Sequence, residues 1–319
     1  MKTKNGLFFL SALLLAGSGC KTTEPEPPKP ISWKQQSAYM AKVKDPRYFG
    51  YSIYQTPSGI EYRGGSRLHP NQAKLLDMEV KEPIRPVVMI RGDLGLQVPL
   101  LLDFTSVSSW MEFDMAESMG AVPLSEGSAQ LVKAPGEEIP GCLSVVSTIR
   151  VGQVFMENPL VYVRMANGSL GSLARGIEKP EIKGVIGWDL FKKFEQIYFD
   201  YSKKRVAIST VKLAYTPDPS QLIAKLPLVK NAGACAVRGI VDGKEGVIFI
   251  DPAGDFEVAT DGATAVSSIV LDPDLVFSAP AVAESPSGTR IGARLLQNYQ
   301  IIICPQAGWV YFEKLQGRR

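Results

Sequence analysis

Two apolar stretches of this chain end in the same way, 148 positions apart. The residues before Asp103 and before Asp251 are almost all apolar, as expected of buried strands, and a short turn follows each aspartate. A glycine typical of a hairpin turn precedes each stretch, at Gly95 and Gly243, and these two are also 148 positions apart. The pattern predicts a duplicated unit in which a buried strand delivers an aspartate to a turn.

The second half of each unit repeats as well. An isoleucine and a glycine, ending at Gly187 and at Gly292, precede a short amphipathic run that is typical of a helix. Each unit then closes with two strand patterns, which are residues 197–201 with 205–208, and 301–304 with 309–312. The order predicts a mostly β protein of two related lobes, with one short helix each, whose pseudo-twofold centre brings Asp103 and Asp251 together.

These patterns divide the chain into six segments. With 319 residues, 45% of them hydrophobic, the chain can bury a core in each of two compact units. A further short helix is expected at residues 71–76. The segments are a leader (1–20), a proline-rich tether (21–30), an N-terminal extension (31–83), a first lobe (84–209), a linker (210–224) and a second lobe (225–315).

The leader indicates export. Two lysines precede an apolar run at residues 7–15, which is too short to span a bilayer, and small residues lead up to Cys20. The small residues before this cysteine resemble a bacterial lipobox, which implies a lipid on Cys20 and attachment to a membrane of the cell envelope. Lys21 in the next position favours the outer membrane. An ordinary signal peptide with an unmodified cysteine is the alternative.

Charge and cysteine content narrow the function classes. The chain has 35 Lys and Arg against 32 Asp and Glu, so nothing favours a nucleic-acid partner. No spacing indicates a metal or another cofactor, and the single histidine, His69, lies outside the repeated units. Cys142, Cys235 and Cys304 fit buried strand positions, although one pair among them could form a disulfide.

The order of strand, aspartate turn, apolar-Gly stretch, short helix and final strand resembles the pepsin-like and retropepsin-like aspartic peptidases. The resemblance implies two β-barrel-like lobes, with Gly187 and Gly292 packed beneath the aspartate turns. It also implies that Asp103 and Asp251 share one proton and activate water against an extended peptide bound between the lobes. An aspartate after a strand can instead only cap its own turn.

The turns depart from the family's Asp-Thr/Ser-Gly. Their sequences are Asp103-Phe104-Thr105-Ser106 and Asp251-Pro252-Ala253-Gly254. Phe104 and Pro252 have no hydroxyl, and Thr105 and Ala253 add a side chain where the family has glycine. Arg290 also departs from the apolar pair expected before Gly292. Two functions therefore stay open, which are an aspartic endopeptidase and a catalytically inactive lipoprotein that binds peptide or protein.

Overall fold

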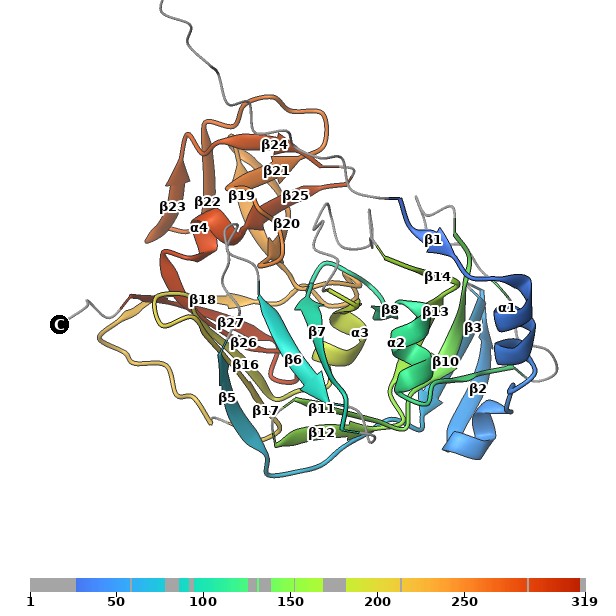
Figure 1. The fold of residues 1–319 in the computed structure, drawn as a ribbon. Helices are drawn as coiled ribbons and strands as arrows, with labels where there is room; N and C mark the ends of the chain where they lie inside the picture. The colour runs from blue at the N-terminus through green and yellow to red at the C-terminus, as the bar shows by residue number, and fades with distance from the viewer. Residues whose placement is uncertain are drawn as a thin grey trace, which may run out of the picture.

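The computed structural model describes residues 27–57, 59–77, 86–91, 95–125, 131, 139–151, 153–168, 182–212, 214–285 and 287–315. The leader and Cys20, with the predicted lipid, lie outside these residues. Figure 1 shows two β-rich lobes that lie against a third, shared sheet. The predicted fold class is confirmed, since the chain is mostly β and its two lobes are related.

The first lobe is built on a ten-stranded sheet. Its strands are β4 (Arg67–Leu68), β6 (Val87–Arg91), β7 (Gln97–Leu102), β8 (Trp110–Met111), β9 (Val122–Pro123), β10 (Gly141–Val145), β11 (Thr148–Val151), β12 (Val154–Glu157), β13 (Leu160–Arg164) and β15 (Gly184–Ile186). They lie in the order β4-β12-β11-β6-β7-β15-β8-β13-β10-β9. β7 leads to Asp103 and pairs in parallel with β15, which leads to Gly187.

The second lobe is built on a seven-stranded sheet. Its strands are β19 (Ala236–Val241), β20 (Lys244–Asp251), β21 (Val258–Thr260), β22 (Ser268–Asp272), β23 (Leu275–Ser278), β24 (Val282–Glu284) and β25 (Thr289–Gly292). They lie in the order β23-β22-β19-β20-β25-β21-β24. β20 ends at Asp251 and pairs in parallel with β25, which ends at Gly292.

The two sheets correspond strand by strand. The order β12-β11-β6-β7-β15-β8-β13 in the first lobe matches the complete order of the second, with the same parallel and antiparallel pairings. β4, β10 and β9 are additional strands on the two edges of the first sheet. The predicted duplication is thus present in the hydrogen-bonded topology as well as in the sequence.

A six-stranded sheet joins the lobes. Its strands are β5 (Ala73–Asp77), β16 (Gln196–Asp200), β17 (Arg205–Ser209), β18 (Leu222–Pro227), β26 (Tyr299–Cys304) and β27 (Trp309–Lys314), in the order β18-β27-β26-β16-β17-β5. The lobes meet where β16 pairs with β26, and there the Gln300 side chain donates a hydrogen bond of 3.1 Å to Asp200. The helix predicted at residues 71–76 is wrong, because β5 pairs along its whole length with β17.

A short helix follows each of the two repeated glycines, Gly187 and Gly292. These are α3 (Trp188–Phe191) and α4 (Ala293–Leu296), and the first lobe adds α2 (Phe113–Ser118). No helix in the part of the chain that the structure describes combines the length and the apolar character needed to cross a membrane.

The N-terminal extension packs on the first lobe, at the right of Figure 1. Here it contains α1 (Trp33–Met40), a 3-10 turn η1 (Pro46–Phe49), β2 (Tyr51–Thr56) and β3 (Gly59–Gly64), and it is preceded by β1 (Lys29–Pro30) of the predicted tether. Ser32 and Gln35 form a capping box at the start of α1. The last two residues of the predicted tether are ordered, since β1 pairs with β14 (Ala166–Asn167).

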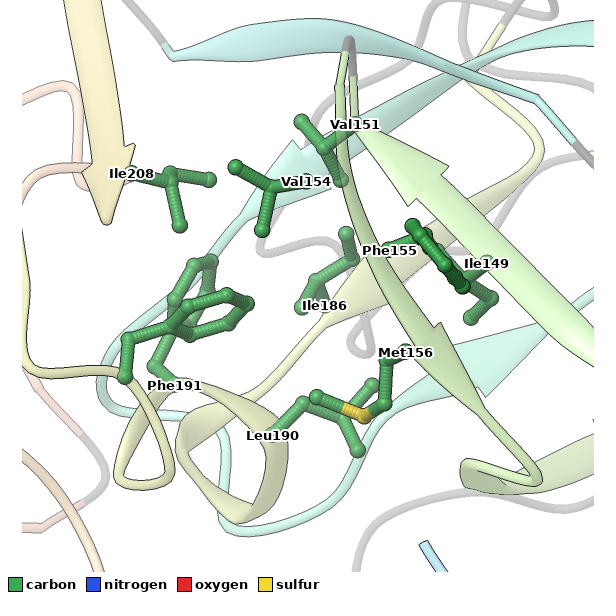
Figure 2. Close-up of a pocket in the computed structure, with 10 residues that line it drawn as sticks. Ile149, Val151, Val154, Phe155, Met156, Ile186, Leu190, Phe191 and Ile208 are labelled. Atoms are coloured by element: carbon green, nitrogen blue, oxygen red, sulfur yellow. The ribbon is translucent and has the colours of Figure 1, made fainter. Parts of the chain in front are cut away.

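The core of the first lobe contains a small cavity of about 20 Å³ (Figure 2). Its lining is entirely hydrophobic, so the cavity offers no polar partner to a bound water molecule. The lining residues are Ile149, Val151, Val154, Phe155, Met156, Ile186, Leu190, Phe191, Phe194 and Ile208. The three cysteines outside the leader are also buried and are free, and burial raises the pKa of the Cys142 thiol to about 11.

Candidate functional site

The two aspartates lie at equivalent places in the two lobes. Asp103 directly follows β7, and its backbone N–H donates to the Ile186 carbonyl of β15 at 3.0 Å. Asp251 is the last residue of β20, beside Gly292 of β25. Both carboxylates are buried, with 1% of Asp103 and none of Asp251 exposed. Asp103 and Asp251 therefore occupy equivalent positions in the two duplicated sheets.

Gly187 and Gly292 pack beneath the two turns, and both must be glycine because any side chain there would collide with backbone. A Cβ on Gly187 would lie 2.6 Å from the Ser108 carbonyl oxygen, and one on Gly292 would overlap the Phe256 carbonyl oxygen. The residue after each glycine donates to the equivalent turn, Trp188 to Ser106 and Ala293 to Gly254, each at 2.8 Å. This close approach explains the repeated Ile-Gly.

Replacing Gly292 by alanine is expected to lower the free energy of unfolding by about 1 to 3 kcal/mol, because the new methyl group overlaps rigid backbone. Urea denaturation measures the change. Gly246→Ala is the matched control, since Gly246 lies on the neighbouring strand β20 with open space around its Cβ position. The control should stay within about 0.5 kcal/mol of the wild type. Equal losses in both variants would contradict the packing role of Gly292.

One oxygen of Asp103 is engaged by its own turn. Asp103 Oδ1 accepts hydrogen bonds from the Thr105 N–H at 2.8 Å, the Thr105 hydroxyl at 2.7 Å and the Ser106 N–H at 3.1 Å. The Ser106 hydroxyl in turn donates to the Ser108 carbonyl. Asp103 thus caps its turn, which was the alternative to a catalytic role.

Phe104 anchors the first turn in the core. Its side chain is fully buried and makes edge-to-face contacts with Trp188, Phe191 and Phe199, at ring-centroid distances of 5.9, 4.5 and 5.3 Å. Its carbonyl accepts a hydrogen bond of 2.9 Å from the Cys235 N–H of the second lobe. A hydrophobic anchor therefore stands where the peptidase family has a hydroxyl.

The second turn packs differently. Ala253 is fully buried in an apolar cluster with Leu101, Ile182 and Val185 of the first lobe. Pro252 is also buried. At Gly254 a side chain would overlap the ring of Phe256, which would have to move to admit it. At Ala253, the contact of this turn with the first lobe is therefore an apolar one.

Arg290 of β25 lies between the two turns. Its Nη1 donates to the Thr105 hydroxyl at 3.0 Å and lies 3.6 Å from Asp251 Oδ2. Its Nε and Nη2 donate to Ser287, and its side chain is only 10% exposed. Contacts therefore run from Asp103 through Thr105 and Arg290 to Asp251. The sequence showed Arg290 as a departure from an apolar pattern, but nothing in it indicated this contact across the lobes.

The arginine changes the electrostatics of the centre. A guanidinium stays protonated in proteins, and a neighbouring cation favours the ionised form of a carboxylate. Asp251 therefore lies next to a fixed positive charge. Burial, and then the negative charge of Asp251, raise the pKa of the Tyr201 phenol. The arrangement is a buried ion pair with hydrogen-bonded neighbours.

The centre is asymmetric although the fold is duplicated. By the strand pairing, Arg290 beside Phe249 in the second lobe corresponds to Val185 beside Leu101 in the first. In one half, Ala253 meets the apolar pair of the first lobe. In the other half, the Thr105 hydroxyl meets Arg290. One half of the lobe junction is thus apolar and the other is polar.

Comparisons with known proteins give similarity in fold only. No family model matches the chain, and no curated protein matches it. Among solved structures, conglutin gamma, a basic 7S globulin from lupine seeds, has 13% identity and a TM-score of 0.49, covering 77% of this chain and 95% of its own. Basic 7S globulin from soybean has 12% identity and a TM-score of 0.49, covering 76% of this chain and 95% of its own.

The assignment to the aspartic peptidase family is therefore wrong. No family model places the chain there, and both of these solved structures are globulins whose fold is pepsin-like. The physical reason is that Phe104 of the first turn packs in the core, while Arg290 of β25 lies beside Asp251. The chain has the bilobal pepsin-like architecture, and its centre has its own chemistry.

Proposed function

We propose that this chain is a catalytically inactive, lipid-anchored protein of the cell envelope that binds an extended peptide or a partner protein. Its two buried aspartates hold the lobes together and do not hydrolyse peptide bonds. The observation that carries the inactive assignment is the Arg290 guanidinium, which lies 3.6 Å from Asp251 Oδ2.

Hydrolysis by paired carboxylates needs one protonated and one ionised partner, so that one polarises the carbonyl while the other activates water. Arg290 favours the ionised form of Asp251 by its charge. Asp103 Oδ1 already accepts three hydrogen bonds from its own turn. Asp103 Oδ1 and Asp251 Oδ2 are therefore both engaged in structural contacts.

The binding half of the proposal is supported by an edge of the second lobe. In the first lobe, β12 pairs on one side with β11 and on the other with β4. Its counterpart β23 pairs with β22, and among the described residues no strand lies on its other side. An exposed edge strand can accept an extended peptide as an additional strand. The duplication shows that this position accepts a strand in the related lobe.

The inactive assignment is tested with an unfolded, carboxymethylated protein as substrate, incubated from acidic to neutral pH. We expect the wild type to cleave it no faster than Asp103→Asn or Asp251→Asn, because neither carboxylate serves catalysis. Fragments are followed by mass spectrometry, and circular dichroism checks that each variant is folded. Cleavage by the wild type that is lost in both aspartate variants would overturn the proposal and establish an aspartic endopeptidase.

A further inference from the structure

Positive charge is concentrated between residue 27, near the end of the tether, and residue 68 of the N-terminal extension. Between residues 27 and 68 the chain has seven Lys and Arg against two Asp and Glu, a surplus larger than the +3 of the whole chain. The remainder of the protein is therefore slightly acidic. All seven of these cationic residues are exposed, and they are Lys29, Lys34, Lys42, Lys44, Arg47, Arg63 and Arg67.

Aromatic side chains are exposed on the same extension. Trp33 at the start of α1 is 78% exposed and Tyr48 of η1 is 76% exposed, more than any other large hydrophobic residue described in the structure. Tyr54 of β2 is 45% exposed. Cations lie over two of these rings, with Lys44 Nζ 5.8 Å from the centroid of Tyr48 and the Arg63 guanidinium 4.6 Å from that of Tyr54. We call α1, η1, β2 and β3, with these side chains, the basic aromatic surface.

The basic aromatic surface is fixed to the body of the protein. Tyr39 of α1 is fully buried, stacks edge-to-face on Phe113 at 5.3 Å and donates a hydrogen bond of 3.0 Å to Ser144. Tyr51 of β2 is buried in a cluster with Leu124 and Val145 of the first lobe. Whatever the surface contacts is therefore held in a defined orientation to both lobes.

We propose that the basic aromatic surface lies on an anionic lipid bilayer. Trp and Tyr side chains prefer the interface between headgroups and acyl chains, and exposed Lys and Arg are attracted to anionic headgroups. An acidic protein would satisfy the charge, but it would not account for a tryptophan left almost fully exposed at position 33. The proposal rests on the proposed anchor for one point, because Cys20 is only 13 positions before Trp33 and a lipid there brings this surface to the membrane.

The test uses the chain from residue 21 onward, which has no lipid but retains every described element. It is mixed with vesicles of phosphatidylcholine alone, and with vesicles that contain an equal share of phosphatidylglycerol. We expect co-sedimentation with the anionic vesicles only, weakened by added salt, together with a blue shift of tryptophan emission. Trp33→Ser should remove that shift without affecting the fold, since the side chain is exposed. Failure to bind anionic vesicles would overturn the proposal.

Charge-reversed variants locate the contact. Lys34→Glu with Lys44→Glu should weaken vesicle binding by about 25-fold or more, at about fivefold for each cation removed. The matched control is Lys230→Glu with Lys244→Glu, two exposed lysines of the second lobe, which changes the net charge equally. Equal weakening in both pairs would overturn the proposal, as would binding to an acidic polypeptide without binding to vesicles.

A separate measurement distinguishes this proposal from the anchor. Fractionation of cells that produce the full chain or its Cys20→Ala variant reports the lipid anchor when the membranes are washed with high salt, which removes protein held by charge. Membrane association that depends on Cys20, combined with no vesicle binding by the unlipidated chain, would leave the anchor standing and reject the surface contact. Vesicle binding together with unchanged fractionation of Cys20→Ala after the high-salt wash would reject the anchor and support the surface contact.

Discussion

Replacing Asp251 by asparagine is expected to lower the free energy of unfolding by about 3 to 5 kcal/mol. Asp251 is fully buried and the Arg290 side chain is nearly so, with 3.6 Å between Nη1 and Oδ2. Without the carboxylate, the guanidinium stays charged in a buried site and loses its contact with the Asp251 carboxylate. Urea denaturation at neutral pH measures the loss.

A double replacement separates the ion pair from other effects of Asp251. Arg290→Val introduces the residue that occupies the equivalent position, Val185, in the first lobe. In Asp251→Asn with Arg290→Val, both charges of the ion pair are removed together, so we expect at least half of the lost stability to return. If the double variant is less stable than Asp251→Asn alone, the loss has another origin than the stranded arginine.

Phe104→Ala is expected to cost about 3 to 5 kcal/mol of unfolding free energy. The ring is fully buried among Trp188, Phe191 and Phe199, so its removal leaves a cavity in the largest core cluster. Urea denaturation at neutral pH measures this loss as well. The consequence for the site is that Phe104 cannot be exchanged for a small hydroxyl residue without a loss of stability.

Phe104→Leu is the control for this prediction, because leucine keeps most of the hydrophobic volume and should cost clearly less than alanine. A cost below about 1 kcal/mol for Phe104→Ala would contradict the anchoring role. Comparable losses for leucine and alanine would indicate that the aromatic contacts, rather than the buried volume, hold the turn.

The duplicated architecture could be predicted from the sequence because its signals are local. The sequence shows a buried strand running into Asp103 and again into Asp251. It also shows the repeated glycines Gly187 and Gly292, where backbone lies too close for a side chain. The helix expected at residues 71–76 failed because pairing with β17 outweighs local preference, and that partner lies about 130 positions away.

The role of Arg290 could not be predicted for a similar reason. The sequence marks it as an exception to an apolar pattern, but its partner Thr105 is 185 positions away, and no spacing rule connects them. Phe104 was recognised as a departure from a turn motif. Its function as a core anchor depends on aromatic residues from α3 and β16, which only the fold brings together.

The unequal halves of the lobe junction determine which lobes can pair during folding. If first lobes from two chains met, the Thr105 hydroxyl would enter the apolar cluster that holds Ala253 and would have no guanidinium to bind. If two second lobes met, Arg290 would face Ala253, which has no hydroxyl. Only the pairing of a first lobe with a second lobe gives Thr105 its guanidinium partner and Ala253 its apolar surroundings. The junction therefore selects against pairing of two first lobes or two second lobes from different molecules.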